Sequence, residues 1–339
     1  MSDAILVQGI PGEQAASGTP ALEARDLTVE YRGGVKAVRG VDLVVRHGET
    51  LGLVGESGSG KSSIGKALVQ LPRPTGGAVL VEGQDLTKLR TRSLRRMRRK
   101  LQMIFQDPIS SLNPRRTALE IVAEPLRIMG HANPRQRAAE VLAEVGVDEE
   151  MAKRRPHELS GGQCQRISIA RAVVQEPELL ICDEPVSALD VSVQAQVLNL
   201  LEKMKAEYAL SMIFISHDLA VVSNISDRVA VLYLGRLCEV ASSTELYAAP
   251  RHHYTQLLLS SVPQPGVVRE KDASVNEINP EAAGAQGCPF ASRCPAATEI
   301  CRTTTPEYRE LAPDHFVACH HPLPAREDLA AREDAGVVA

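Results

Sequence analysis

An eight-residue, glycine-rich segment from Gly55 to Ser62 constrains this chain more than any other segment. Its sequence, GESGSGKS, fits the phosphate-loop pattern, in which two glycines stand five residues apart and are followed by Lys and by Ser or Thr. The short apolar run at 50–54 predicts a strand before it, and residues 63–69 predict a helix after it. An ordinary Gly-rich turn would not need these flanks, so we expect a phosphate-binding loop.

The residues of this loop have separate expected roles. Gly55, Gly58 and Gly60 allow the backbone to turn tightly, so that its N–H groups and the positive N-terminus of the following helix hold phosphate oxygens. Lys61 places a positive charge against the outer phosphates. The Ser62 hydroxyl is the expected Mg²⁺ ligand, because Mg²⁺ takes oxygen ligands. The candidate phosphate site is Gly55, Glu56, Ser57, Gly58, Ser59, Gly60, Lys61, Ser62 and Ser63.

Length and composition limit the class of protein. The 339 residues predict more than one typical domain and fewer than three. The net charge of −4 and the aromatic content of 3% argue against a nucleic-acid partner, and the basic run at 90–100 is better interpreted as a solvated helix face. We find no apolar run long enough to span a membrane and no signal peptide. We therefore expect a cytoplasmic protein whose cysteines do not form structural disulfides.

Two further segments carry chemistry. Residues 159–163, LSGGQ, precede a helix expected over 165–174, which makes a second anion-binding helix terminus. A single nucleotide needs only one such terminus, so the second is free to act on a nucleotide held by another chain. The apolar strand expected over 179–184 ends in Asp183, which can hold magnesium, and Glu184, which can polarise an attacking water.

Single residues at other strand ends give weaker signals. Gln106 and His217 each follow an expected apolar strand. A Gln at a strand end proves nothing by itself, and a lone His is more often structural. Tyr31 ends the strand expected over 27–31, where its ring could stack on a base or be an ordinary half-buried strand tyrosine.

Taken together and in this order, these segments resemble the nucleotide-binding subunit of an ABC transporter over about residues 21–262. The LSGGQ sequence is highly specific in this context. The resemblance implies an α/β fold, the P-loop NTPase ABC cassette, with a RecA-like core, an antiparallel β part and a helical subdomain at about 108–175. A mobile N-terminal tail is expected over 1–20. Two such subunits would close head to tail over two ATP molecules.

The resemblance also implies roles for the matching residues. Tyr31 stands where the family keeps an aromatic residue that stacks on adenine. Glu184 is implied as the general base, and His217 as the group that stabilises the developing charge. The implied Mg²⁺ ligands are Ser62, Gln106 and Asp183. The implied nucleotide contacts outside the phosphate loop are Tyr31, Asp183, Asp190, Ser160, Gly161, Gly162 and Gln163, with Ser160, Gly161 and Gly162 facing the phosphate loop of the other subunit.

Longer matches resemble the oligopeptide/dipeptide importer branch. They are QDPISSLNP at 106–114, SALDVSVQAQ at 187–196 and HYTQLL at 253–258. Cys164 and His252 depart from the residues usual in the family, but neither stands at a phosphate-binding position. The implied partners are two membrane permease subunits, a second ABC ATPase subunit, identical or homologous, and an extracytoplasmic peptide-binding protein. The implied location is the cytoplasmic face of the cell membrane.

The function implied by the resemblance is ATP hydrolysis that powers the import of oligopeptides or dipeptides. Relatives that import nickel or glutathione share these motifs, so the solute stays open. A soluble ABC ATPase that acts on nucleic acid or ribosomes is a further alternative. Such proteins usually carry two cassettes or a long coiled coil, whereas this sequence has one cassette and no heptads of that kind.

Four cysteines crowd the last quarter of the chain, after a segment over 263–287 whose composition predicts a linker. They are Cys288, Cys294, Cys301 and Cys319. Their gaps of five, six and seventeen residues match neither a zinc ribbon nor the ferredoxin spacings. Four clustered thiols in a cytosolic chain nevertheless favour a metal over disulfides.

The resemblance bears on these cysteines too. The peptide-importer branch has a C-terminal extension with a motif of the kind CPFxxRCP, here at 288–295, and some members carry a [4Fe–4S] cluster on it. We expect the extension over 288–323 and a solvated tail over 324–339. Three alternatives stay open: a [4Fe–4S] cluster, zinc, or no metal. The residues His315, His320 and His321 could substitute as zinc ligands, although surface histidines are the plainer interpretation.

Overall fold

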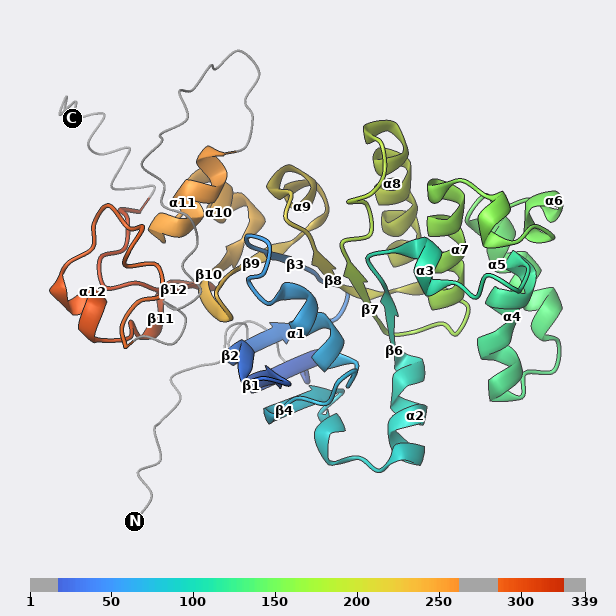
Figure 1. Cartoon of the computed structure of the whole chain (residues 1–339), viewed down its shortest axis with the longest axis horizontal. Helices are drawn as coiled ribbons and strands as arrows, with labels where there is room; N and C mark the ends of the chain where they lie inside the picture. Colours follow the sequence, from blue (N-terminus) through green and yellow to red (C-terminus); the bar gives the residue numbers. More distant parts are fainter. Residues whose placement is uncertain (1–17, 262–285, 326–339) are drawn as a thin grey trace.

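The structure is a computed structural model that describes residues 18–261 and 286–325. Two sheets organise these residues, a four-stranded sheet in the order β2-β1-β4-β5 and an eight-stranded sheet in the order β11-β12-β10-β9-β3-β8-β7-β6. In Figure 1 the helices α4 to α7 lie at one end of the molecule, and the C-terminal elements β11, β12 and α12 lie at the opposite end. The expected linker and both expected tails fall almost entirely outside the described residues.

The strands have the following bounds. In the smaller sheet they are β1 (Leu22–Tyr31), β2 (Val35–Val45), β4 (Gly76–Val81) and β5 (Gln84–Asp85). In the larger sheet they are β3 (Thr50–Val54), β6 (Leu101–Ile104), β7 (Leu179–Asp183), β8 (Ser211–Ile215), β9 (Arg228–Tyr233), β10 (Arg236–Ser242), β11 (Tyr308–Ala312) and β12 (His315–Ala318). The strand expected over 27–31 is therefore the end of the longer strand β1, which pairs antiparallel with β2.

The helices connect and cover these sheets. The α-helices are α1 (Lys61–Leu68), α2 (Thr91–Lys100), α3 (Pro108–Ser111), α4 (Ala118–Met129), α5 (Pro134–Glu144), α6 (Glu149–Ala152), α7 (Gly161–Val173), α8 (Val191–Tyr208), α9 (Leu219–Ile225), α10 (Ser243–Ala248), α11 (His253–Ser260) and α12 (Glu299–Thr303). Two 3₁₀ turns are η1 (Leu86–Lys88) and η2 (Pro156–Glu158). No helix in these two described stretches is both long and apolar enough to cross a bilayer.

The centre of the larger sheet is parallel. Strand β7 pairs in parallel with β6 and β8, and β3 pairs in parallel with β8 and β9. Parallel strands place their carboxyl ends at the same edge of a sheet, so the segments that follow β3, β6, β7 and β8 start side by side. Five of the candidate site residues meet at this edge: Ser62, Gln106, Asp183, Glu184 and His217.

Both faces of this parallel core are covered, which explains the continuous apolar runs in its strands. On β7 and β8, Leu180 and Phe214 pack into a core cluster with helices α7 and α8. The neighbouring residues Ile181 and Ile213 point to the other face and pack into a second cluster with α1 and the smaller sheet. All four side chains are fully buried.

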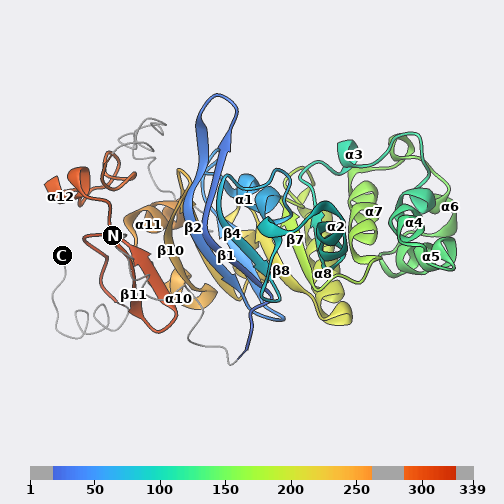
Figure 2. The ribbon, with the colours of Figure 1, turned by 90° about the horizontal axis from the view of Figure 1, so that it is seen from below.

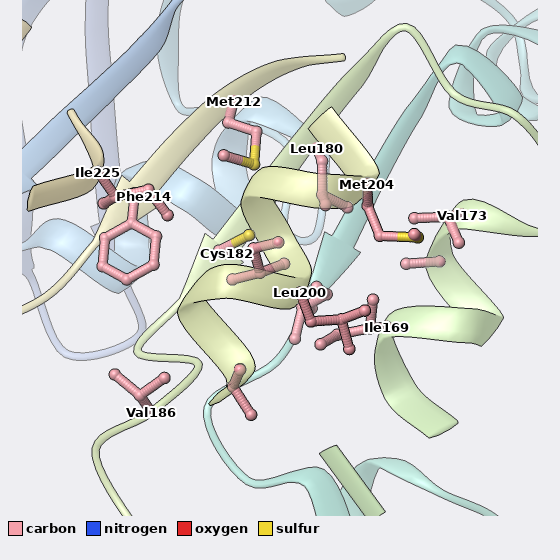
Figure 3. Packing of buried hydrophobic residues seen from close by; sticks show 14 of the residues in the cluster. Ile169, Val173, Leu180, Cys182, Val186, Leu200, Met204, Met212, Phe214 and Ile225 are labelled. Atoms are coloured by element: carbon pink, nitrogen blue, oxygen red, sulfur yellow. The ribbon is translucent and has the colours of Figure 1, made fainter. Parts of the chain in front are cut away.

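Helices α7 and α8 pack against each other, and α7 also packs against β6 of the sheet. Figure 3 shows Leu200 and Met204 of α8 next to Ile169 and Val173 of α7, with Leu180 of β7 close by. These apolar side chains recur at helical spacing, so each helix presents a buried stripe to its neighbour. The packing fixes α7, and with it the glycine pair at its start.

The helices between β6 and β7 carry clear local signals. The Thr117 side chain accepts a hydrogen bond from the backbone N–H of Glu120, and the Glu120 side chain accepts one from the backbone N–H of Thr117. This capping box starts α4. Gly130 ends that helix with a φ of 75°, a conformation that favours glycine. Pro134 stands in the first turn of α5. These signals mark the starts of α4 and α5 and the end of α4.

One expected helix boundary is wrong. The helix expected over 165–174 begins four residues earlier, at Gly161. Two adjacent glycines are poor helix formers, but Ser160 and Gln163 form a capping box that satisfies the free N–H groups of the first turn. Capping therefore outweighs the low helix propensity of the glycines.

The C-terminal residues continue the larger sheet. Strand β12 pairs antiparallel with β10, through Glu239 with Val317 and Val240 with Phe316. The guanidinium of Arg46 donates to a carboxylate oxygen of Asp314 at 2.7 Å, which ties the β11–β12 hairpin to the loop before β3. The extension is thus joined to the cassette by backbone pairing and by ion pairs.

This packing predicts a large stability difference between two isoleucines on helices. Replacing buried Ile169 of α7 by Ala should lower the free energy of unfolding by about 2–5 kcal/mol, because it removes packed apolar volume and leaves a cavity. The matched control is Ile128→Ala on α4, where the side chain is 81% exposed and the change should stay within about 0.5 kcal/mol. Urea unfolding of both variants measures the difference, and equal losses would contradict the assignment of the core.

Candidate functional site

The phosphate loop joins β3 to α1 and depends on glycine at two close approaches. Gly55 has a φ of 153°, and a Cβ there would lie 2.1 Å from the carbonyl oxygen of Leu232. Gly60 has a φ of 105°, and a Cβ there would lie 2.3 Å from the carbonyl oxygen of Ala37. Side chains at these positions would force the loop away from β9 and β2, so glycine is required by contact as well as by conformation.

Lys61 is the first residue of α1, and its side chain is buried inside the loop. Its ammonium donates to the carbonyl oxygens of Gly55 at 2.7 Å and of Glu56 at 2.9 Å. Burial lowers the pKa of Lys61, while the carboxylates of Glu184, Asp183 and Glu56 oppose this effect. The loop therefore folds around a positive charge and holds it at the carboxyl edge of the sheet.

The end of β7 brings a carboxylate to this charge. Ser62 donates from its hydroxyl to Asp183 Oδ1 at 2.7 Å. Burial raises the pKa of Asp183, and the hydrogen bond from Ser62 and the charge of Lys66 offset only part of that rise. A divalent cation beside these oxygens would favour the charged carboxylate, so this pair fits the Mg²⁺ expected at the site.

Glu184 connects two other strand ends. Its Oε2 accepts a hydrogen bond from Gln106 Nε2 at 2.9 Å, and its Oε1 lies 3.3 Å from His217 Nδ1. Its backbone has a φ of 46°, an uncommon conformation for a non-glycine residue that often marks a functional site. A hydrogen bond from its N–H to the carbonyl of Ile215 holds it there at 3.0 Å.

Tyr31 lies at the end of β1, next to the same loop. Its side chain is 37% exposed, and its hydroxyl donates to Ser63 Oγ at 3.2 Å. Ser63 belongs to the first turn of α1, so the ring stands beside the phosphate loop rather than in the core. An exposed aromatic face at this position is available for stacking.

The LSGGQ segment lies at the start of α7, in a different part of the fold from the phosphate loop. Ser160 caps α7, which stands among the helices that follow β6, away from α1 in Figures 1 and 2. A Cβ on Gly162 would lie 2.6 Å from Val193 of α8. The α8 cap is Asp190, whose carboxylate accepts the N–H of Val193 at 2.9 Å. The structure thus places Asp190 near the signature segment, and places neither of them at this chain's own phosphate loop.

Two residues outside every predicted site, Arg293 and Tyr254, bond to Glu56 of the phosphate loop, and Tyr233 contacts Arg293. Arg293 forms a two-bond ion pair with the Glu56 carboxylate. Its NH1 also lies 3.4 Å from the hydroxyl of Tyr233. The hydroxyl of Tyr254 accepts the backbone N–H of Glu56 at 2.9 Å. The hydrogen bonds that Arg293 donates to Glu56 raise the pKa of Arg293. Arg293 belongs to the CPFxxRCP motif, which is the only sequence signal for this contact.

The four C-terminal thiols line one small cavity, together with Phe290. Burial raises the pKa of Cys288 and of Cys319 to about 11, and the neighbouring thiols add to the effect. Within residues 18–261 and 286–325, no group of three or more His, Cys, Asp or Glu side chains is placed to hold a metal ion. The four expected cysteine ligands therefore line one cavity, but they are not placed to bind one metal ion together.

The three C-terminal histidines have other partners. His315 is buried, and its Nε2 lies 2.7 Å from a carboxylate oxygen of Glu239, so the interpretation of His315 as a surface histidine was wrong. His315 belongs to β12 and Glu239 to β10, so the pairing of these two strands brings the two side chains together. His320 bonds to the carbonyl of Thr304 and His321 to the hydroxyl of Thr298.

Comparisons with known families match two parts of the chain. Residues 38–187 match the family described as ABC transporter, and residues 238–301 match the oligopeptide/dipeptide transporter C-terminal region. The second match begins in β10 and includes Cys288, Cys294 and Cys301. The two matches together include the phosphate loop, the carboxylate pair and three of the four C-terminal cysteines.

Individual relatives cover almost the whole chain. The oligopeptide transport ATP-binding protein AppF of Bacillus subtilis is 51% identical over 324 residues, which are 90% of this chain and 98% of the relative. A putative peptide import ATP-binding protein of Brucella ovis is 47% identical over 309 residues, 89% of this chain and 98% of the relative.

Solved structures agree with this assignment. The cbiO1 protein of Clostridium perfringens, part of the ABC transporter complex cbiONQ, has a TM-score of 0.62 at 27% identity and covers 68% of this chain and 91% of its own. The ATP-binding cassette MJ0796, in a dimeric post-hydrolysis state with ADP and phosphate, has a TM-score of 0.60 at 31% identity and covers 66% of this chain and 98% of its own. The expected fold is confirmed, and the chain belongs to the ABC transporter ATPases, in the branch of the oligopeptide and dipeptide transport ATP-binding proteins.

Proposed function

We propose that this ATPase powers the import of oligopeptides or dipeptides through two partner permease subunits. The observation that carries the proposal is the meeting of a phosphate loop, a carboxylate pair and two polar side chains at one sheet edge, in a chain that an oligopeptide transport protein matches over 90% of its length. The named relatives favour peptides over the alternatives of nickel and glutathione, and over a soluble ATPase that acts on nucleic acid.

The site geometry supports a role for each residue in hydrolysis. Mg²⁺, when bound with ATP, would neutralise charge on the β- and γ-phosphates, held by Ser62, Gln106 and Asp183. Glu184 is the general base, because it projects from a strained turn beside the expected position of the γ-phosphate. His217 lies on the other side of that carboxylate and would donate to the γ-phosphate as charge develops.

The nucleotide site is proposed to be completed by a second cassette. The signature residues Ser160, Gly161 and Gly162 lie at the start of α7, which stands among the helices at one end of the molecule, away from α1 in Figures 1 and 2. The helix N-terminus they form has backbone N–H groups suited to a phosphate. Head-to-tail pairing with a second copy or a homologue would place them over the nucleotide of the partner, and the similar cassette MJ0796 is dimeric.

The permease subunits are proposed to dock beside Gln106. A hollow near this residue is lined by Phe105, Asp107 and Ser111 and reaches Lys66 and Asp183. Its lining includes Asp183 of the nucleotide site and Ser110 and Ser111 of α3, so an inserted helix would contact both. Docking there would place the chain at the cytoplasmic face of the membrane, with the peptide-binding protein on the opposite face.

The cysteine-lined cavity is proposed to hold a [4Fe–4S] cluster. Such a cluster takes one thiolate on each of four irons, so its ligands surround a volume instead of meeting at one ion. Four thiols line one cavity, which matches the number of thiolate ligands that such a cluster takes. When bound, the cluster would supply a rigid centre for the extension.

Anaerobic purification tests the cluster. The protein should be brown, absorb near 400 nm and contain about four irons and no zinc per chain. Cys301→Ser should lose the colour and most of the iron, because it removes one ligand. Cys164→Ser is the matched control, since that thiol is buried in α7 and far from the cavity. Colourless, iron-free wild-type protein would refute the cluster.

Replacing Glu184 by Gln tests the general base. The variant should bind Mg·ATP normally and hydrolyse it about 10²–10⁴-fold more slowly, because an amide accepts no proton at neutral pH. Glu202→Gln, at an exposed position of α8, is the matched control and should leave the rate unchanged. A Glu184→Gln rate equal to that of the wild type would assign the base elsewhere.

Isolation of the chain from its native membranes in mild detergent tests the transport role. Copurification of two multi-span subunits and a second cassette, with a peptide on an associated binding protein, is the expected result. Recovery with ribosomes or nucleic acid, and without a membrane subunit, would show that the cassette belongs to a different machine.

A further inference from the structure

Glu56, the second residue of the phosphate loop, is held by the C-terminal part of the chain. Its carboxylate accepts hydrogen bonds from Arg293 NH1 at 2.8 Å and from Arg293 NH2 at 2.9 Å. Its backbone N–H donates to the hydroxyl of Tyr254. The two ends of this contact are 237 residues apart in the sequence, so only the folded C-terminal extension can supply it.

The ion pair is shielded from water on the arginine side. The Arg293 side chain is 5% exposed, and its guanidinium lies 5.8 Å from the ring centre of Tyr233 and 5.7 Å from that of Phe290. Two parallel hydrogen bonds in a dry setting fix both the distance and the orientation of the carboxylate. Removing one partner would leave a buried charge unpaired, so the pair is sensitive to small displacements.

Glu56 transmits its position to the phosphate-binding lysine. Its carbonyl oxygen accepts the ammonium of Lys61 at 2.9 Å and the backbone N–H of Ser59 at 3.2 Å. A shift of Glu56 would therefore move both the positive charge and a loop N–H group. The geometry of phosphate binding depends on where Arg293 holds this residue.

Arg293 is in turn positioned by the cysteines. It directly precedes Cys294 in the sequence, and its backbone N–H donates to the carbonyl of Phe290 at 3.0 Å. That turn is fixed by a hydrogen bond from the N–H of Ala291 to the carbonyl of Cys288, also 3.0 Å. The N–H of Cys288 donates to the carbonyl of Cys301 at 2.7 Å, which joins the turn to α12.

We propose that Arg293 is a positioning residue of the phosphate loop, through which the cysteine-lined part of the extension controls ATP affinity. The inference rests on the proposed function as an ATP-driven importer, which supplies the reason to regulate this site. An ordered set of thiols keeps Arg293 on Glu56 and the loop ready for ATP. Displacement of the turn that carries Cys294 withdraws the guanidinium and loosens the loop.

Nucleotide binding to the full chain tests the ion pair. Arg293→Gln should raise the Kd for the magnesium complex of a non-hydrolysable ATP analogue about tenfold, measured by calorimetry. In hydrolysis, KM for ATP should rise while kcat stays within about twofold, because Arg293 does not touch the reacting atoms. Arg309→Gln, at an exposed position of β11 in the same extension, is the matched control and should change neither constant.

A double-mutant cycle separates positioning from general stability. Glu56→Gln should raise the Kd by a similar factor, and the double variant should bind no worse than either single variant, because both remove the same interaction. Arg293→Lys keeps the charge but offers a single bonding point, so its Kd should lie between those of wild type and Arg293→Gln. This variant keeps the test valid if Arg293→Gln folds poorly.

The link to the cysteines has its own readout. Cys294→Ser should raise the Kd in the wild-type chain and add nothing in the Arg293→Gln chain. Equal effects in both backgrounds, or an unchanged Kd for folded Arg293→Gln and Arg293→Lys, would overturn the inference. Failure of the wild-type chain to bind the analogue would instead refute the proposed function, so the two failures are distinguishable.

Discussion

The parallel pairing of β3, β6, β7 and β8 is the constraint on which the site depends. Residues that are remote in sequence meet because these strands end at one edge. The phosphate loop follows β3, the carboxylate pair ends β7, and His217 follows β8. Two sets of contacts then link these strand ends. Ser62 bonds to Asp183, and Glu184 contacts both Gln106 and His217. Apolar side chains pack against both faces of the sheet, and this packing holds the strand ends in position.

The phosphate loop and the carboxylate pair could be predicted from the sequence, because each is marked by residues that are adjacent in the chain. The phosphate loop needs glycines at set positions, and the pair at 183–184 follows an unbroken apolar strand. The start of α7 was missed because propensity disfavours Gly161 in a helix, whereas a capping box formed by Ser160 decides the boundary. The family resemblance, rather than residue spacing, gave Gln106 and His217 their roles.

The C-terminal arrangement could not be predicted, because it depends on contacts between distant segments. Pairing of β12 with β10 joins residues about 240 and 316, on either side of the expected linker. The burial of His315 against Glu239 follows from that pairing. The ion pair of Arg293 with Glu56 also joins distant segments, and the CPFxxRCP motif does not show which residue Arg293 meets. The extension is consequently a part of the cassette's sheet. Its cysteine-lined cavity is connected to the phosphate loop through Arg293, which directly precedes Cys294 and forms an ion pair with Glu56.

The central claim is that ATP hydrolysis at this sheet edge drives peptide import. Its most direct test is the uptake of a labelled oligopeptide into vesicles that contain the permease subunits, both cassettes and the peptide-binding protein, with ATP supplied on the cassette side. The account predicts uptake that requires ATP and stops when ADP replaces it. Hydrolysis that proceeds equally without the permease subunits, with no uptake of any peptide by the assembled complex, would contradict it.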